Sequence, residues 1–505
     1  MVSNRQRPLR RAADAMITGT HSCMCQLPKT LHLLDDFPPV STEAWNGAIQ
    51  VDLKGADYNK KLLWNTDEGI VVRPYFRRED TQDLERQIEP IPGAFPFVRG
   101  RGSQSWQQVE SPGALPTGAI RADAFHDQGG TVVQELGYGI ALGVEKLVEK
   151  LDAGHSVEEA ANAIRFVFAI GSNYFFEIAK LRAARLLWAH AVWAFQPQEE
   201  SSCLMKIHAC TALSDKSIYD PFANVLRATT EAIAAVIGGC DSLEIRPFGF
   251  DSRLAVNIQR LIKEESHLDS VADPAGGSYY IEWLTDALAH KGWELFQQVE
   301  AEGGYTRAKP AIDSALAKSR AAKEKAISSR RRTLVGVNNY PDLNETSVDP
   351  PEAPPGIWRA ASPFEQLRRR TEADARKRGK RPKVLLLEHG DLTMRQARSQ
   401  FSQNFFGCAG FEIEISHEYR QTDADLIVLC SSDPEYLKLA EEVCPTVNQP
   451  VIIAGDPKNQ LDQLKATGVQ GFVHIRTDAI TALTEWQNRL GIGAQGTTHG
   501  NDNQT

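Results

Sequence analysis

The strongest constraint on the fold is an alternation of short apolar runs and long helical patterns between residues 120 and 335. Strands and helices in turn predict a parallel α/β sheet or barrel. We count four such β/α units, whereas a closed barrel needs eight and typically takes about 250 residues. The predicted strands are Arg121–Phe125, Phe166–Ile170, Leu204–His208 and Leu243–Phe248, and the predicted helices are Thr131–Leu151, Asn173–Phe195, Pro221–Ile237 and Arg253–Glu265.

A second α/β region follows at residues 382–490. Its length and its order of strands and helices predict a flavodoxin-like doubly wound sheet. The predicted strands are Val384–Leu387, Leu426–Cys430, Val451–Ala454 and Gly471–Ile475, and the predicted helices are Met394–Phe406, Glu435–Val443 and Leu461–Thr467.

The remaining segments complete a six-part division of the chain. We predict a disordered tail at 1–35, an arm at 36–100, a shortened barrel region at 101–345, a linker at 346–381, the second α/β region at 382–490 and a disordered tail at 491–505. The arm should hold a helix at 41–53, because Ser41 and Thr42 can cap it. Residues 101–119 have the composition of a connecting loop.

Two charged segments allow more than one interpretation. Four arginines precede the first acidic residue, which weakly resembles a transit peptide, although a disordered tail or an early start codon also explains them. The basic segment 368–383 follows a proline-rich stretch at 348–356. It fits either a patch for a partner or phosphate, or a solvated interdomain helix and linker.

Composition excludes several classes of protein. The 505 residues suffice for roughly two to four domains. A net charge of −9 and a pI of about 5.8 argue against a general nucleic-acid binder. No apolar run approaches the ~20 residues of a membrane helix. The eight cysteines form no CxxC pair and match no zinc pattern, which favours a cytoplasmic protein with reduced thiols.

The stretch Asp273–Tyr280 reads DPAGGSYY. Proline biases the residue before it away from helix, and the two glycines let the backbone pass close to another surface. Physically, this is a tight loop that leads into a helix from about Glu282 to Val299.

The amino-acid sequence of DPAGGSYY and of several other segments resembles the methylmalonyl-CoA mutase family. The further segments lie at 37–80, 131–145 (TVVQELGYGIALGVE), 168–189 (FAIGSNYFFEIAKLRAARLLWA), 219–243 (YDPFANVLRATTEAIAAVIGGCDSL) and 335–341 (VGVNNYP). The order of arm, barrel units, linker and flavodoxin-like region also agrees. Segments 403–412 (QNFFGCAGFE) and 426–440 (LIVLCSSDPEYLKLA) are similar to the small subunit of the family.

The resemblance implies adenosylcobalamin radical chemistry that interconverts methylmalonyl-CoA and succinyl-CoA, as in propionate metabolism. Catalytic members ligate cobalt through the histidine of a D-x-H-x-x-G motif. No such motif occurs at 384–393, where Leu387 and Leu392 flank His389 at the motif's aspartate and glycine positions. We therefore expect no catalytic, cofactor-binding or metal-binding residues in this chain, with His389 as a weak candidate ligand.

Two histidines match pocket positions of the family. His126 falls where the family has a histidine that hydrogen-bonds the thioester carbonyl, and His208 falls at another pocket histidine. Catalytic members have glutamine two residues after the second one, and here that position is Cys210. A vestigial or structural role for both is the expectation.

The first half of the barrel has no match. Four β/α units of roughly 30 residues would fill about 120 residues. A half barrel should leave two sheet edges unpaired and its core open on one side. Three accounts remain open: a shortened small subunit that leans on its partner, two copies that complete one barrel, or a damaged reading frame.

The leading hypothesis is a non-catalytic small subunit that forms a heterodimer with a large subunit, which holds the adenosylcobalamin. The arm would contact that partner, and acyl-CoA would bind to this chain at most weakly. The alternatives are a self-standing cobalamin-dependent mutase, an acyl-CoA-binding scaffold and a non-functional remnant. No nucleic-acid or membrane partner is expected.

Overall fold

The computed structural model describes residues 39–102, 105–109, 118–345 and 355–493. The chain divides into two compact units, one up to Trp64 and one from Asn65. The tail predicted at 1–35 and most of that predicted at 491–505 lie outside the described residues. The six-part division made from the sequence stays a prediction.

The first unit is a pair of short helices, α2 (Thr42–Asp52) and α3 (Tyr58–Leu62). The Ser41 hydroxyl accepts a hydrogen bond from the amide of Ala44 at 3.2 Å, which caps α2 where the sequence predicts a helix. No side chain of either helix is buried. At the boundary, β1 (Trp64–Asn65) pairs with β2 (Val71–Val72).

The first large sheet has five parallel strands in the order β3-β7-β6-β5-β4. The first strand in sequence therefore lies beside the last, which is the order of a barrel opened between β3 and β4. No closed barrel forms among the described residues. The strands are β3 (Gln107–Gln108), β4 (Ala119–Arg121), β5 (Arg165–Ile170), β6 (Ile207–Thr211) and β7 (Ser242–Glu244).

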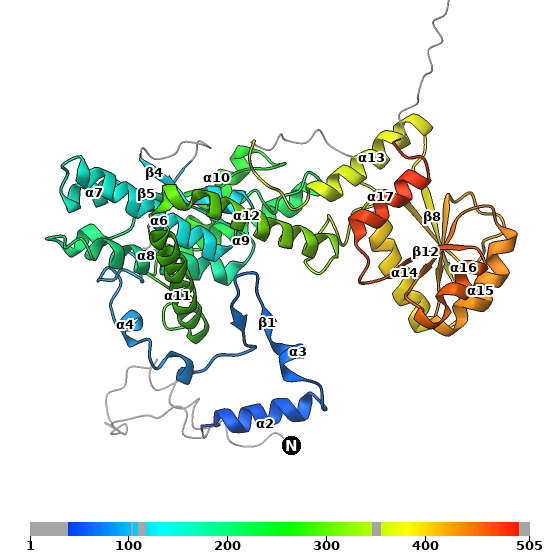
Figure 1. Ribbon diagram of the computed structural model, residues 1–505, viewed down its shortest axis with the longest axis horizontal. Helices are drawn as coiled ribbons and strands as arrows, with labels where there is room; N and C mark the ends of the chain where they lie inside the picture. Colours follow the sequence, from blue (N-terminus) through cyan, green and yellow to red (C-terminus); the bar gives the residue numbers. More distant parts are fainter. Residues whose placement is uncertain (1–38, 103–104, 110–117, 346–354, 494–505) are drawn as a thin grey trace, which may run out of the picture. The chain divides into compact units, whose positions relative to one another are not determined.

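Helices cover this sheet and share one continuous apolar core with it (Figure 1). Local signals start several of them. Thr131 and Gln134 form a reciprocal capping box at the start of α6, and Asp220 caps α9 with Pro221 in its first turn. The helices are α4 (Glu85–Ile88), α5 (Asp123–Asp127), α6 (Val132–Asp152), α7 (Val157–Ala163), α8 (Tyr174–Trp193), α9 (Pro221–Ile237), α10 (Ser252–Arg260), α11 (Tyr279–Ala301) and α12 (Tyr305–Ser328).

Three predictions in this region are wrong. The strand predicted at Arg121–Phe125 ends at Arg121, and α5 begins at Asp123, because a short apolar run does not distinguish strand from helix. The strand predicted at Leu204–His208 is instead Ile207–Thr211, since a 3₁₀ turn occupies Glu200–Cys203. The loop predicted at 101–119 contains β3, whose glutamines give no apolar signal.

The second large sheet is parallel, with the order β12-β11-β10-β8-β9. Counted from β8, this is the order 2-1-3-4-5. The strands are β8 (Lys383–Glu388), β9 (Glu412–Ser416), β10 (Leu426–Cys430), β11 (Val451–Ala454) and β12 (Val469–Val473), and the helices are α13 (Ser362–Arg378), α14 (Leu392–Gly407), α15 (Tyr436–Val443), α16 (Leu461–Ala466) and α17 (Ala479–Arg489).

Both faces of this second sheet are covered. Val384 and Leu386 pack on one side with Phe405 and Phe406 of α14. Leu385 and Leu387 pack on the other side, with α15 and α16 (Figure 1). The described helices include none that is long and apolar enough to cross a lipid bilayer.

Candidate functional site

Polar side chains gather on one face of the first sheet. Successive residues of a strand point to opposite faces, and on β6 Ile207 and Ala209 join the core beneath the helices. His208 and Cys210 point to the other face and are also buried. The expectation that an incomplete barrel leaves its core open is therefore wrong for β6.

His208 is held by two groups of the neighbouring strand β7. Its Nδ1 lies 2.8 Å from the Ser242 hydroxyl, and its Nε2 lies 3.5 Å from a carboxylate oxygen of Glu244. Two positions further along β6, the thiol of Cys210 approaches Asp123 at 3.8 Å. Burial raises the pKa of Cys210 well above its usual value, so the thiol stays protonated.

His126 lies on α5, the short helix between β4 and α6. Its Nε2 lies 3.3 Å from the hydroxyl of Ser214, in the loop after β6. Burial, reinforced by the positive charges of Lys180 and Lys323, lowers the pKa of His126 well below 6.5. The imidazole is therefore neutral at neutral pH.

Arg246, immediately after β7, links these groups, and the sequence analysis did not single it out. Its Nε donates to the carbonyl of Thr211 at 2.6 Å, and its Nη1 lies 3.3 Å from Asp127 on α5. Buried Arg246 Nη2 and Asp127 Oδ1 have no hydrogen-bond partner in the part of the chain that the structure describes. The one available signal was position, since Thr211 ends β6, Arg246 lies two residues after β7, and Asp127 ends α5, the short helix after β4.

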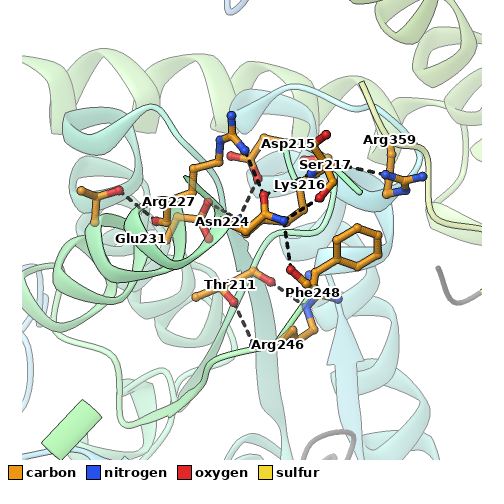
Figure 2. A network of polar contacts seen from close by, with 12 residues as sticks. Thr211, Asp215, Lys216, Ser217, Asn224, Arg227, Glu231, Arg246, Phe248 and Arg359 are labelled. Atoms are coloured by element: carbon orange, nitrogen blue, oxygen red, sulfur yellow. Dashed lines mark hydrogen bonds and ion pairs between the residues drawn. The ribbon is translucent and has the colours of Figure 1, made fainter. Parts of the chain in front are cut away.

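The loop after β6 is pinned by a buried set of ion pairs (Figure 2). The amino group of Lys216 lies 2.8 Å from Asp215 and 2.5 Å from Glu231 of α9. Burial and the neighbouring Asp215 raise the pKa of Glu231 well above its usual value. The side-chain amide of Asn224 donates to the backbone carbonyls of Ser217 and Phe248, at 2.6 and 2.9 Å. These contacts fix the loop that carries Ser214.

A segment just before α13 crosses the same loop. The amide of Trp358 donates to the carbonyl of Asp127 at 2.7 Å, and the amide of Ala360 donates to that of Ser214 at 2.8 Å. Between them, Arg359 makes two bonds to Glu365, at 2.7 and 2.6 Å, and lies over the ring of Phe248. The segment therefore covers part of the polar cluster.

A second buried cluster forms hydrogen bonds with the edge of β5 beyond the point where β4 ends. Glu135 accepts from the amide of Ala169 at 2.7 Å, and Lys180 donates to the carbonyl of the same residue. Lys180 also pairs with Glu135 at 2.7 Å and with Glu177. Burial raises the pKa of Glu135 to about 8, against the opposing effect of Lys180. Side chains here take the place of strand hydrogen bonds.

The DPAGGSYY loop joins three parts of the second unit. The carboxylate of Asp273 pairs with Arg182 on α8 and, at 2.8 Å, with Arg99. Arg182 also pairs at 2.7 Å with Glu282, whose carbonyl accepts from Gln87 at 2.9 Å. The loop is therefore a buried crosslink between α8, α11 and the segment before β3.

The predicted role of close approach holds for Gly276, whereas Gly277 has no neighbour within 4 Å and is favoured by its backbone conformation. A Cβ on Gly276 would lie 2.5 Å from the Asp273 carboxylate, and Gly277 has a φ of +82°. Helix α11 begins at Tyr279, three residues before the predicted start. Beside the loop is a cavity of about 470 Å³ lined by Arg73, Pro74 and aromatic rings that include Phe76, Phe175 and Tyr280.

At the second sheet, His389 follows β8 and is exposed. In the loop after β10, the carboxylate of Glu435 accepts from the hydroxyls of Ser431 and Ser432, at 2.7 and 2.6 Å. The predicted residues thus lie at two separate places: His126 and His208 belong to the first sheet, and His389 belongs to the second.

Comparison with known proteins identifies the family of this chain. The family model for methylmalonyl-CoA mutase matches residues 106–379. The methylmalonyl-CoA mutase small subunit of Porphyromonas gingivalis is 32% identical over 616 aligned residues, which cover 91% of this chain and 99% of that protein. The chain belongs to the methylmalonyl-CoA mutase family.

Small and large subunits of this family match different shares of the chain. A probable methylmalonyl-CoA mutase small subunit of Mycobacterium bovis is 33% identical, over 82% of this chain and 72% of its own length. The methylmalonyl-CoA mutase large subunit of P. gingivalis is 39% identical, but over only 46% of this chain and 34% of its own length. Small subunits therefore match more of the chain.

The alignment with the P. gingivalis small subunit also measures what is missing. Its 616 positions contain about 91% of the 505 residues of this chain. Well over a hundred positions of the relative therefore have no counterpart here. This agrees with the β/α units that the sequence lacks.

The second sheet does not fit the adenosylcobalamin that the family implies. The cobalt-ligating motif needs an aspartate two residues before the histidine, and that position holds Leu387, which is only 2% exposed within the core. The loop that carries exposed His389 is joined to the loop after β10 by the Glu435 carboxylate, which accepts from the amide of Asp391. We therefore assign no reaction step to a cofactor on this chain.

Proposed function

We propose that this chain is the non-catalytic small subunit of a methylmalonyl-CoA mutase and forms a heterodimer with a large subunit. The observation that carries the proposal is the full-length match to a small subunit, against a partial match to a large subunit. In this assignment, the large subunit holds adenosylcobalamin, and the two chains together interconvert methylmalonyl-CoA and succinyl-CoA.

The state of the family's pocket histidines supports a non-catalytic role. His126 is neutral and only partly exposed, and His208 is held between Ser242 and Glu244. Asp127 and Ser214 are covered by the segment at Trp358–Ala360. A residue that acts on a substrate needs access to it, and these contacts restrict that access.

We further propose that the two sheets are a shortened TIM-type barrel and a flavodoxin-like domain. Five strands are three short of eight, so two copies would bring ten strands rather than complete one barrel. The buried inner face of β5 and β6 favours a shortened subunit over a damaged reading frame. The six described cysteines are free thiols, which suits the cytoplasmic location that we propose.

The first unit supplies a candidate contact with the large subunit. Helix α2 exposes Trp45 at 46% and Val51 at 74%, and none of its side chains is buried. Exposed apolar side chains on a helix without a core of its own commonly mark an interface. The proposed subunit contact is therefore part of the predicted arm.

Co-expression with a cognate large subunit tests the proposal. We expect a stable 1:1 complex and mutase activity that depends on the large subunit. Val51→Asp should weaken the complex by about tenfold or more, because it places a charge in an apolar contact, without changing the melting temperature of this chain alone. Gln50→Ala on the same helix is the matched control. Absence of a complex at micromolar concentrations would overturn the assignment.

A second candidate is a weak acyl-CoA-binding scaffold. The unpaired buried atoms of Arg246 and Asp127 favour it, because such atoms can accept a ligand. Titration calorimetry with a CoA thioester decides between the two. Binding by the isolated chain that Arg246→Ala abolishes would support the scaffold, and no heat above that of dilution would exclude it.

A further inference from the structure

The second sheet has a topological switch point between β8 and β10. Helix α14 after β8 packs on one face, and α15 after β10 packs on the other. In doubly wound sheets, the crevice between two such loops, at the carboxyl ends of the strands, is where ligands bind. Here the two loops are 389–391 and 431–435.

The half-exposed carboxylate of Glu435 bridges these two loops. It accepts hydrogen bonds from the hydroxyls of Ser431 and Ser432 and from the amides of Ser432 and Asp391, the last two at 3.2 and 3.4 Å. The Ser432 hydroxyl and the other donors lower the pKa of Glu435 to about 2, so the group is ionised at neutral pH. The ionised carboxylate of Glu435 therefore lies between the two loops.

The loop after β8 is shaped around this anion. Gly390 has a φ of +74°, and a Cβ at that position would collide with the carboxylate of Glu435. The bond to Asp391 spans 44 residues of sequence, whereas a capping box needs only the local bonds to Ser432. We call the contacts of Glu435 with Ser431, Ser432 and Asp391 the Glu435 clamp.

We propose that the Glu435 clamp closes the ligand crevice of the second sheet, with the protein's own carboxylate in the place of a ligand. This deepens the proposed non-catalytic function and rests on it. The sheet is then a self-occupied structural element, closed to a cofactor by the clamp as well as by the missing ligand motif. The opposing view is that Glu435 only caps the 3₁₀ turn that precedes α15.

Hydrogen–deuterium exchange on the full chain in its complex separates these views. Glu435→Ala should speed exchange roughly tenfold or more in peptides that cover both 389–394 and 431–436, since charge-assisted bonds are lost. Added acetate should restore protection by filling the vacated site, and chloride at equal ionic strength should not. Glu441→Ala on α15 is the control and should change neither peptide.

A change confined to 431–436 would reduce Glu435 to a local cap and overturn the clamp. If Glu435→Ala does not fold, Glu435→Gln keeps the volume and should give a smaller exchange change in both loops.

Hydroxocobalamin absorbance adds a second readout. The wild-type chain without the large subunit should leave the spectrum unchanged, and a shift that His389→Ala abolishes would show an open crevice. Complex formation with the large subunit is scored separately, so failure of the proposed function is distinguishable from failure of the clamp.

Discussion

The two large sheets have the same number of parallel strands, but they are stabilised by different chemistry. The strands β8, β10 and β11 bury almost only apolar side chains. Around the first sheet, charged side chains are buried in pairs and networks. These include Glu135, Glu177, Lys180, Arg182, Arg185, Lys216, Glu231, Glu244 and Glu282.

This difference teaches how each sheet depends on its neighbours. Apolar packing is non-directional and tolerates substitution of similar volume. A buried charge is stable only while its partner is present, because desolvation costs several kcal/mol per ion. The region around the first sheet is therefore specified by particular pairs of residues and the strands of the second sheet by shape and volume, while helix α13 also buries the pair Arg368 and Glu372.

The largest expected effect comes from breaking a pair. Arg182→Met leaves the carboxylates of Asp273 and Glu282 buried without this cation, and we expect a loss of about 3–5 kcal/mol in the free energy of unfolding. Urea denaturation measures it. The loss should be smaller near pH 5 than near pH 8, because the abandoned carboxylates can take up protons. A loss below about 1 kcal/mol would contradict the role of the DPAGGSYY crosslink.

A cavity in the second sheet should cost slightly less. Leu386→Ala removes a fully buried side chain, and we expect a loss of about 3 kcal/mol. Denaturation at several pH values should give the same loss, since no charge is involved. A marked pH dependence would show that the two sheets do not differ in the way described.

The smallest effect concerns the neutral His126. Because its pKa is lowered in the folded chain, the unfolded state takes up the proton first, and stability should fall as the pH drops below about 6.5. His126→Asn should reduce this fall in melts at pH 7 and below. The exposed His389→Asn is the control, and an equal change in both variants would refute the assignment.

Much of the fold could be predicted from local sequence. The observed bounds of α9, β10 and β11 are those predicted, because Asp220–Pro221 marks a helix start and the two strands are continuous apolar runs. The family could also be predicted, since DPAGGSYY and the other segments carry it. The absence of a cobalt-ligating motif is likewise visible in the residues around His389.

The elements that were missed lack such local signals. Strand β3 is two glutamines whose pairing with β7 depends on residues more than a hundred positions away. The edge strand β9 reads EIEIS, and the sequence analysis did not identify it. Arg246 belongs to the site only because Thr211 and Asp127 meet it in space.

Sequence alone determined the family, the parallel α/β class and the absence of the ligand motif, because these depend on residue identity and short-range periodicity. The tertiary structure decided that the inner face of the first sheet is buried, that DPAGGSYY is a crosslink and that Glu435 joins the loops after β8 and β10. Each of these depends on contacts between segments far apart in the chain, and hydrogen bonds and ion pairs form only at distances that folding sets.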